Sequence, residues 1–184
     1  MDFKNCNLDG IVICKPKIIR DNRGFFAESF RKDLLESLLL KKYDFCQCNI
    51  SESNFGVLRG LHFQSNPKAQ TKLISVQSGE ILDVVLDLRI DSSSYGKTFS
   101  IILNDKNNYQ LLIPKGFAHG FISLSKKSKI QYWVDEYFCS DNDCGINAFD
   151  DNLNIDWKLK KTEIIRSQKD TFLPDFNNNF KFTK

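Results

Sequence analysis

The chain has little histidine, and none of its cysteines is spaced for metal binding. Only two of its 184 residues are histidines, and none of the six cysteines stands in a C-x-x-C pair. Structural zinc sites use four cysteine or histidine ligands at close spacing, which this sequence does not offer. The N-terminal residues also lack the apolar run of a secretory signal. We therefore expect a cytoplasmic protein whose cysteines are free, reduced thiols.

Long apolar runs and blocks of like charge are missing as well. No stretch approaches the roughly 20 apolar residues that a membrane-spanning helix needs. The net charge is only +3, and the basic residues are scattered. The sequence therefore favours neither a membrane nor a nucleic-acid partner. Its length is typical of one domain, and we predict a single domain over residues 1–184.

Short strands separated by polar turns fill most of the chain. We predict them over residues 10–14, 25–30, 45–50, 73–76, 81–88, 98–103, 109–113, 121–124 and 130–134. Leucines at helical spacing predict one helix over residues 33–40, and a short helix is expected around residues 167–171. Residues 177–182 are expected to be weakly ordered. Many short strands with few helices indicate an all-β sandwich or barrel.

The two histidines lie in two separate motifs. The spacing Pro114-x-Gly116-x-x-His119 is similar to the second half-motif of the cupin superfamily, whose fold is a double-stranded β-helix, or jelly roll. In metal-binding cupins the first half-motif supplies H-x-H and a glutamate. Here the corresponding stretch, Leu61-His62-Phe63-Gln64, has one histidine. Because two histidines make a poor transition-metal site, we predict a barrel without metal or cofactor.

The stretch from Gly56 to Gln64 is compatible with a core strand or with a proton-transfer site. A neutral His62 could act as a general base, with Asp83 or Asp170 fixing its tautomer. Strict alternation along a strand places Arg59 and His62 on opposite faces. Both can therefore serve one pocket only if the chain bends at Gly60.

Four other side chains suit chemistry beside a ketone on a phosphorylated substrate. Lys72 could stabilise an enolate oxygen, and Tyr132 could act as an acid. Arg23 and Arg59 could bind phosphate through paired hydrogen bonds. Each residue alone has an ordinary explanation, such as a surface charge or a core ring, but together they favour an enzyme that moves protons.

Longer motifs follow one another in a characteristic order. They are Asp21-x-Arg23-Gly24-Phe25-Phe26-x-Glu28, Gln47-x-Asn49, Gly56 to Gln64, Gln70-x-Lys72-Leu73, Gly96-Lys97, Ile113 to Phe121, Leu153-Asn154-Ile155-x-Trp157 and Lys169-Asp170. With them the chain resembles the dTDP-4-dehydrorhamnose 3,5-epimerases and their relatives that act on other nucleotide-linked 4-keto sugars. The resemblance implies a cupin-type homodimer that inverts C3 and C5 of such a sugar.

The resemblance also implies a role for each candidate residue. His62 would remove the proton beside the 4-keto group with Asp170 as its partner, Tyr132 would return a proton to the opposite face, and Lys72 would hold the enolate oxygen. The remaining residues would bind substrate: Arg59 and His119 at the sugar or diphosphate, Arg23, Phe26, Glu28, Gln47 and Asn49 at the nucleotide end, partly from the partner subunit, and Tyr137 and Asp143 near the base or sugar.

Several positions depart from the family's pattern and leave the substrate open. Tyr137-Phe138 stands where relatives commonly have two tyrosines, Asp143 replaces a glutamate, and Ala148 replaces a tryptophan. Since Tyr137 and Phe138 lie where relatives stack on the base or sugar, both dTDP and GDP, and both a hexose and a heptose, stay possible. Inversion at C3 alone is a further alternative.

Other functions fit only part of the pattern. A 3,4-ketoisomerase on the same fold would move the carbonyl, and an acid such as Tyr132 opposite His62 argues against it. A non-catalytic cupin that binds a sugar nucleotide would lack an acid, a base or an oxyanion group. A metal-dependent oxygenase would need more ligands. In the epimerase interpretation the product enters surface-polysaccharide synthesis, of a lipopolysaccharide or capsule.

Overall fold

The computed structural model describes residues 1–40, 42–176 and 182. Residues 41, 177–181 and 183–184 lie outside this part, so the expected weak order of residues 177–182 is not tested. Within the described part no helix is long and apolar enough to cross a membrane. The six cysteines are all free thiols, as the sequence predicted.

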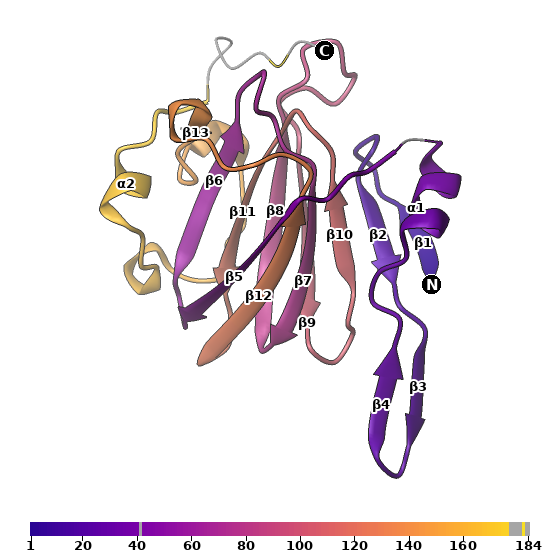
Figure 1. Ribbon diagram of the computed structural model, residues 1–184. Coiled ribbons are helices and arrows are strands. Elements are labelled where there is room, and N and C mark those ends of the chain that lie inside the picture. Colours follow the sequence, from indigo (N-terminus) through magenta and orange to yellow (C-terminus); the bar gives the residue numbers. More distant parts are fainter. Residues whose placement is uncertain (41, 177–181, 183–184) are drawn as a thin grey trace.

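Two antiparallel sheets form the body of the protein (Figure 1). The first has the order β1 (Asp2–Asn5), β2 (Val12–Lys15), β10 (Gln110–Ile113), β7 (Lys72–Ser78), β12 (Lys127–Val134) and β5 (Gln47–Asn54). The second has the order β13 (Asp143–Gly145), β6 (Leu58–Gln64), β11 (Phe117–Ser123), β8 (Glu80–Asp87) and β9 (Thr98–Asn104). This arrangement confirms the predicted all-β, cupin-type fold.

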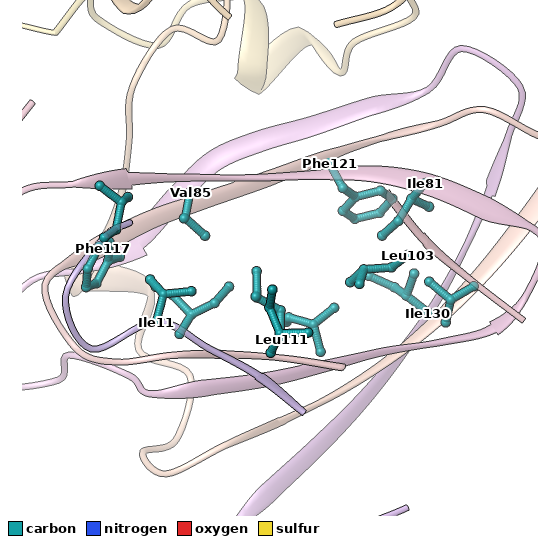
Figure 2. Close-up of a cluster of buried hydrophobic side chains, with 13 residues drawn as sticks. Ile11, Ile81, Val85, Leu103, Leu111, Phe117, Phe121 and Ile130 are labelled. Atoms are coloured by element: carbon teal, nitrogen blue, oxygen red, sulfur yellow. The ribbon is translucent and has the colours of Figure 1, made fainter. Parts of the chain in front are cut away.

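The main hydrophobic core lies between the two sheets. Figure 2 shows Leu111 and Ile130 of the first sheet packing towards Ile81, Val85 and Phe121 of the second. A second core covers the opposite face of the five-stranded sheet, where residues 146–164 pack on it. Strand β8 is therefore buried on both faces, which explains why its sequence is a nearly continuous apolar run.

Few elements stand outside the two sheets. Strands β3 (Ile18–Asp21) and β4 (Gly24–Ala27) form a hairpin arm that projects away from the body (Figure 1). The predicted helices are confirmed to within about one residue as α1 (Lys32–Leu39) and α2 (Gln168–Thr171). Short 3-10 helices cover Ser140–Asn142, Asp151–Leu153 and Lys161–Glu163.

Several strands differ from the sequence prediction. Strands β1 and β13 were not predicted, because each is short and exists through pairing with a distant strand, β2 and β6 respectively. Strand β11 begins at Phe117, four residues before the predicted start, and so contains His119. The predicted strand over 25–30 ends at Ala27, where the arm ends.

Candidate active site

A cleft of about 700 Å³ opens between the sheets. This volume is within the range usual for small-molecule sites. Nine residues predicted to form the site line it: Gln47, Asn49, Arg59, His62, Lys72, His119, Tyr132, Asp143 and Asp170. They come from strands of both sheets and from α2, so the fold brings together residues far apart in the sequence.

A bulge in β6 places Arg59 and His62 in the same cleft. His62 pairs with His119 of β11, whereas Arg59 pairs with Phe121, so two residues of β6, Gly60 and Leu61, lie opposite the single residue Gly120 of β11. The extra residue reverses the side-chain alternation, as a β-bulge does. Gly60 has a φ of +121°, a conformation that favours glycine. The bend that the sequence required at Gly60 is therefore present.

The bulge brings β6 so close to Gly120 of β11 that a side chain at this position would collide with β6. A Cβ at Gly120 would lie 2.7 Å from the carbonyl oxygen of Arg59 and 2.9 Å from the side chain of Leu61. We expect Gly120→Ala to lower the free energy of unfolding by about 1–3 kcal/mol, since packed strands yield only partly to an added methyl group. Urea unfolding measures this, and an unchanged midpoint would show that the two strands separate freely.

The carboxylate that contacts His62 is Asp170. Their Nε2 and Oδ1 atoms are 2.7 Å apart, and the Asp170 side chain is only 4% exposed. Burial alone would raise the pKa of Asp170, but hydrogen bonds from His62, the Gly60 N–H and Ser167 together lower it below its usual value. An ionised Asp170 that accepts Nε2–H leaves Nδ1 of His62 as the basic atom.

The other candidate carboxylate, Asp83, contacts the second histidine. Asp83 Oδ2 lies 2.9 Å from Nε2 of His119, and neither side chain is more than 9% exposed. The cleft therefore holds two histidines, each paired with its own carboxylate, on neighbouring strands.

Lys72 and Tyr132 are the two side chains of the six-stranded sheet that could serve an oxyanion and an acid. Burial lowers the pKa of Lys72 to about 8, against the opposite effects of Asp143 and Asp83. Burial also raises the pKa of the Tyr132 hydroxyl, with Arg59 opposing and Asp143 adding to the rise. At neutral pH Lys72 is thus still mostly a cation and Tyr132 a protonated phenol.

Polar contacts hold the wall residues in place. Arg59 Nε donates to Ser53 Oγ at 3.1 Å, which fixes the guanidinium on the rim. Gln47 accepts a hydrogen bond from the backbone N–H of Phe138. Asp143 forms an ion pair with Lys169, the residue before Asp170. The cleft therefore combines cations with hydrogen-bonding groups, as an anionic sugar derivative requires.

Four predicted residues do not line this cleft, namely Arg23, Phe26, Glu28 and Tyr137. Arg23 forms an ion pair with Asp21 at the tip of the arm, and Phe26 is 68% exposed. Tyr137 is exposed, and its neighbour Phe138 lines the cleft instead.

Several lining residues received no predicted role. They are Ser51, Gln64, Gln70, Arg166, Ser167 and Lys169, together with the apolar side chains between them. Gln64, Gln70 and Lys169 belong to the motifs quoted from the sequence, which was the available signal. Ser51 has none beyond alternation with Gln47 and Asn49 along β5.

Among residues 1–40, 42–176 and 182, no group of three or more His, Cys, Asp and Glu side chains is arranged to hold a metal ion. The site without metal or cofactor stays a prediction from the sequence.

Comparisons with known proteins identify the family. The chain matches the family model described as dTDP-4-dehydrorhamnose 3,5-epimerase over residues 5–178. It is 41% identical over 170 residues to the dTDP-4-dehydrorhamnose 3,5-epimerase of Escherichia coli, covering 92% of this chain and 91% of that one.

Solved structures of family members resemble the fold of this chain. The dTDP-4-dehydrorhamnose 3,5-epimerase of Bacillus anthracis, with TDP and pyrophosphate bound, has a TM-score of 0.91 at 44% identity, covering 95% of this chain and 99% of that one. The Legionella pneumophila dTDP-6-deoxy-D-glucose-3,5-epimerase, in complex with dTDP-4-keto-L-rhamnose, has a TM-score of 0.93 at 38% identity, covering 100% and 98%. The chain therefore belongs to the dTDP-4-dehydrorhamnose 3,5-epimerase family and is an epimerase, an isomerase that acts on carbohydrates.

Proposed function

We propose that the protein inverts C3 and C5 of a dTDP-linked 4-keto-6-deoxyhexose through an enolate. The observation that carries this is that His62, with Asp170 behind it, and Tyr132 project into one cleft from opposite sheets. Inversion needs a base on one face of the sugar and an acid on the other, and two facing walls supply both. The dTDP nucleotide is inferred from the relatives, one of which binds TDP.

Each proton transfer follows the same course in this proposal. Nδ1 of His62 removes a proton from a carbon next to the 4-keto group, and Asp170 stabilises the imidazolium that forms. The negative charge moves to the keto oxygen, where the Lys72 ammonium stabilises it. Tyr132 then donates its hydroxyl proton to the other face of the same carbon. C3 and C5 both adjoin C4, so the step serves either carbon.

Solvent exchange tests the reaction and its position. In heavy water, dTDP-4-keto-6-deoxyglucose is expected to lose the proton NMR signals of both C3–H and C5–H as deuterium enters. Deuterium at C3 alone would indicate a C3 epimerase. Exchange only with GDP-linked hexoses or heptoses would change the substrate, and binding without exchange in any of these sugars would support a non-catalytic binding protein.

Tyr132→Phe is expected to separate exchange from inversion. Without the phenol, the imidazolium of His62 returns the proton or deuteron to the face it came from. Inversion should fall by about 10²-fold, whereas exchange at the carbon next to the ketone should fall much less. Proton NMR in heavy water follows both rates in one sample. Equal losses of exchange and inversion would place Tyr132 in a different role.

The arm points to a homodimer with shared sites. Arg23, Phe26 and Glu28 lie on or beside the β3–β4 arm, away from the cleft of their own chain. Ile19, Phe25 and Phe26 are all more than half exposed on this arm, which favours a partner that covers them. We infer that the arm of each subunit reaches the nucleotide end of its partner's cleft. The epimerised sugar would then supply surface-polysaccharide synthesis.

Mixed dimers test this sharing of residues between subunits. His62→Asn and Arg23→Ala should each impair the homodimer. A heterodimer of the two, purified through two different tags, holds one site in which both residues are intact. Its activity should approach about half that of wild type. If Arg23 instead serves its own chain, the heterodimer will show only the mean activity of the two defective homodimers.

A further inference from the structure

The buried carboxylate of Asp83 has no part in the reaction as described above. Asp83 lies on β8 and does not line the cleft, yet it contacts the ring of His119, which does. His119 in turn pairs directly across the strands with His62. The base His62 and the second histidine therefore stand side by side, and each is held from behind by an aspartate from a different element.

The surroundings of Asp83 are unfavourable for a carboxylate. The residue is fully buried, and its neighbours Leu82 and Val84 are at most 3% exposed. Ile81 and Val85, on the same face of β8, belong to the core between the sheets. One carboxylate oxygen, Oδ1, has no hydrogen-bond partner within the described residues. Since a buried and incompletely bonded charge is costly, an apolar residue would serve packing better here.

The hydrogen bond between Asp83 and His119 decides which ring nitrogen of His119 is available to a ligand. Oδ2 of Asp83 accepts the hydrogen on Nε2, so this nitrogen faces the core. In the described part of the chain, Nδ1 has no hydrogen-bond partner. Because His119 lines the cleft, Nδ1 is the ring atom left for a ligand.

The charges around His119 favour a substrate oxygen that becomes negative. A carboxylate that is hydrogen-bonded to one ring nitrogen of a histidine stabilises the imidazolium form of that ring. Asp83 also acts electrostatically on Lys72, whose ammonium donates to the backbone oxygen of His62 at 3.4 Å. The ring of His119 and the ammonium of Lys72 therefore belong to one region of the cleft.

We propose that Asp83 is a positioning residue that holds Nε2–H of His119 towards the core and favours the imidazolium form of the ring, in which Nδ1–H donates to the sugar oxygen on which negative charge develops. His119 then shares the oxyanion with Lys72, and Asp83 touches neither the substrate nor the reacting atoms. This assignment of the substrate atom rests on the proposed epimerisation. The orientation of the His119 ring does not rest on the proposed epimerisation, because it follows from the Asp83–His119 contact alone.

Nitrogen-15 NMR of the imidazole rings tests the orientation directly. The chain has only two histidines, so two sets of ring signals are expected, and His62→Asn assigns them. In the wild type, both ring nitrogens of His119 should carry a proton, and the proton on Nε2 should exchange slowly with solvent. In Asp83→Asn this set should change, and the His62 set should keep its positions. A wild-type His119 in which either Nε2 or Nδ1 carries no proton would overturn the proposal, even if the variant does not fold.

Kinetics of Asp83→Asn test the effect on the reaction, with Asp87→Asn as the matched control. Asp87 is equally buried on the same face of β8, but it bonds Arg89, Ser92 and Ser94 and lies outside the cleft. We expect kcat to fall roughly ten- to a hundredfold in Asp83→Asn, with KM changed less than about threefold. Asp87→Asn should alter neither kcat nor the His119 signals.

The outcomes separate this proposal from the proposed function. Unchanged His119 signals or an unchanged kcat in folded Asp83→Asn would overturn the positioning role. An equal loss of kcat in both variants would do the same, because it would reflect a general cost of losing a buried carboxylate. If instead the wild type exchanges no 4-keto sugar, the epimerase proposal fails, while the ring spectrum still decides how His119 is held.

Discussion

Replacing His62 with asparagine is expected to lower kcat about 10³-fold or more, the upper part of the range for loss of a general base. The reason is geometric. Nε2 of His62 is bound by Asp170 at 2.7 Å, so the opposite ring nitrogen is the basic atom facing the cleft. Asparagine keeps a polar side chain of similar size without a basic nitrogen. Proton NMR of dTDP-4-keto-6-deoxyglucose in heavy water measures the loss.

Two controls make this result specific. The variant should unfold at the same urea concentration as the wild type, and calorimetry should show that it still binds dTDP, because His62 is proposed to act on the sugar. Residual activity within tenfold of the wild type would show that another group removes the proton.

Lys72→Met is expected to lower kcat by about 10²- to 10³-fold, the loss typical of one oxyanion donor. Methionine has a similar length and keeps the contacts of the side-chain stem, but it carries no charge. Lys127→Met is the matched control, because Lys127 lies on β12 outside the cleft, 62% exposed and paired with Glu52. It should leave kcat unchanged. An equal loss in both variants would remove Lys72 from the reaction.

The pH dependence gives a second test of Lys72. Burial lowers its pKa to about 8, so the ammonium is present below that pH and is lost as the pH rises through it. Since only the cation stabilises an enolate, kcat/KM of the wild type, which reports the pKa values of the free enzyme, should fall above about pH 8. This alkaline limb should be absent from the remaining activity of Lys72→Met. If the alkaline limb persists in Lys72→Met, it belongs to a group other than Lys72.

The sequence predicted the fold and most of the site because both depend on local patterns. Regular spacing of apolar runs and turns is enough to indicate a β-barrel. The position of Arg59 was not predictable in the same way. Alternation placed it opposite His62, and only the pairing of β6 with β11, in contact with Gly120, shows the bulge that reverses it.

Other features depend on contacts between distant segments. The residues alone left both Asp83 and Asp170 as candidates for His62, because no local pattern says which carboxylate the fold brings close. Only the resemblance to the family named Asp170, which the structure places against His62. That Arg23 and Glu28 lie away from the cleft of their own chain was likewise not visible in the residues, and only the resemblance implied that part of the nucleotide end comes from the partner subunit. A motif indicates that residues serve a ligand, but it carries no information on which subunit holds that ligand.

Deuterium exchange in heavy water tests the central claim most directly, with wild type and His62→Asn compared on dTDP-4-keto-6-deoxyglucose. For the wild type we expect deuterium at both C3 and C5 and formation of dTDP-4-keto-L-rhamnose. His62→Asn should show neither at a comparable rate. Exchange that proceeds equally in the two proteins, or that is absent from the wild type, would contradict the assignment of His62 as the base of a 3,5-epimerase.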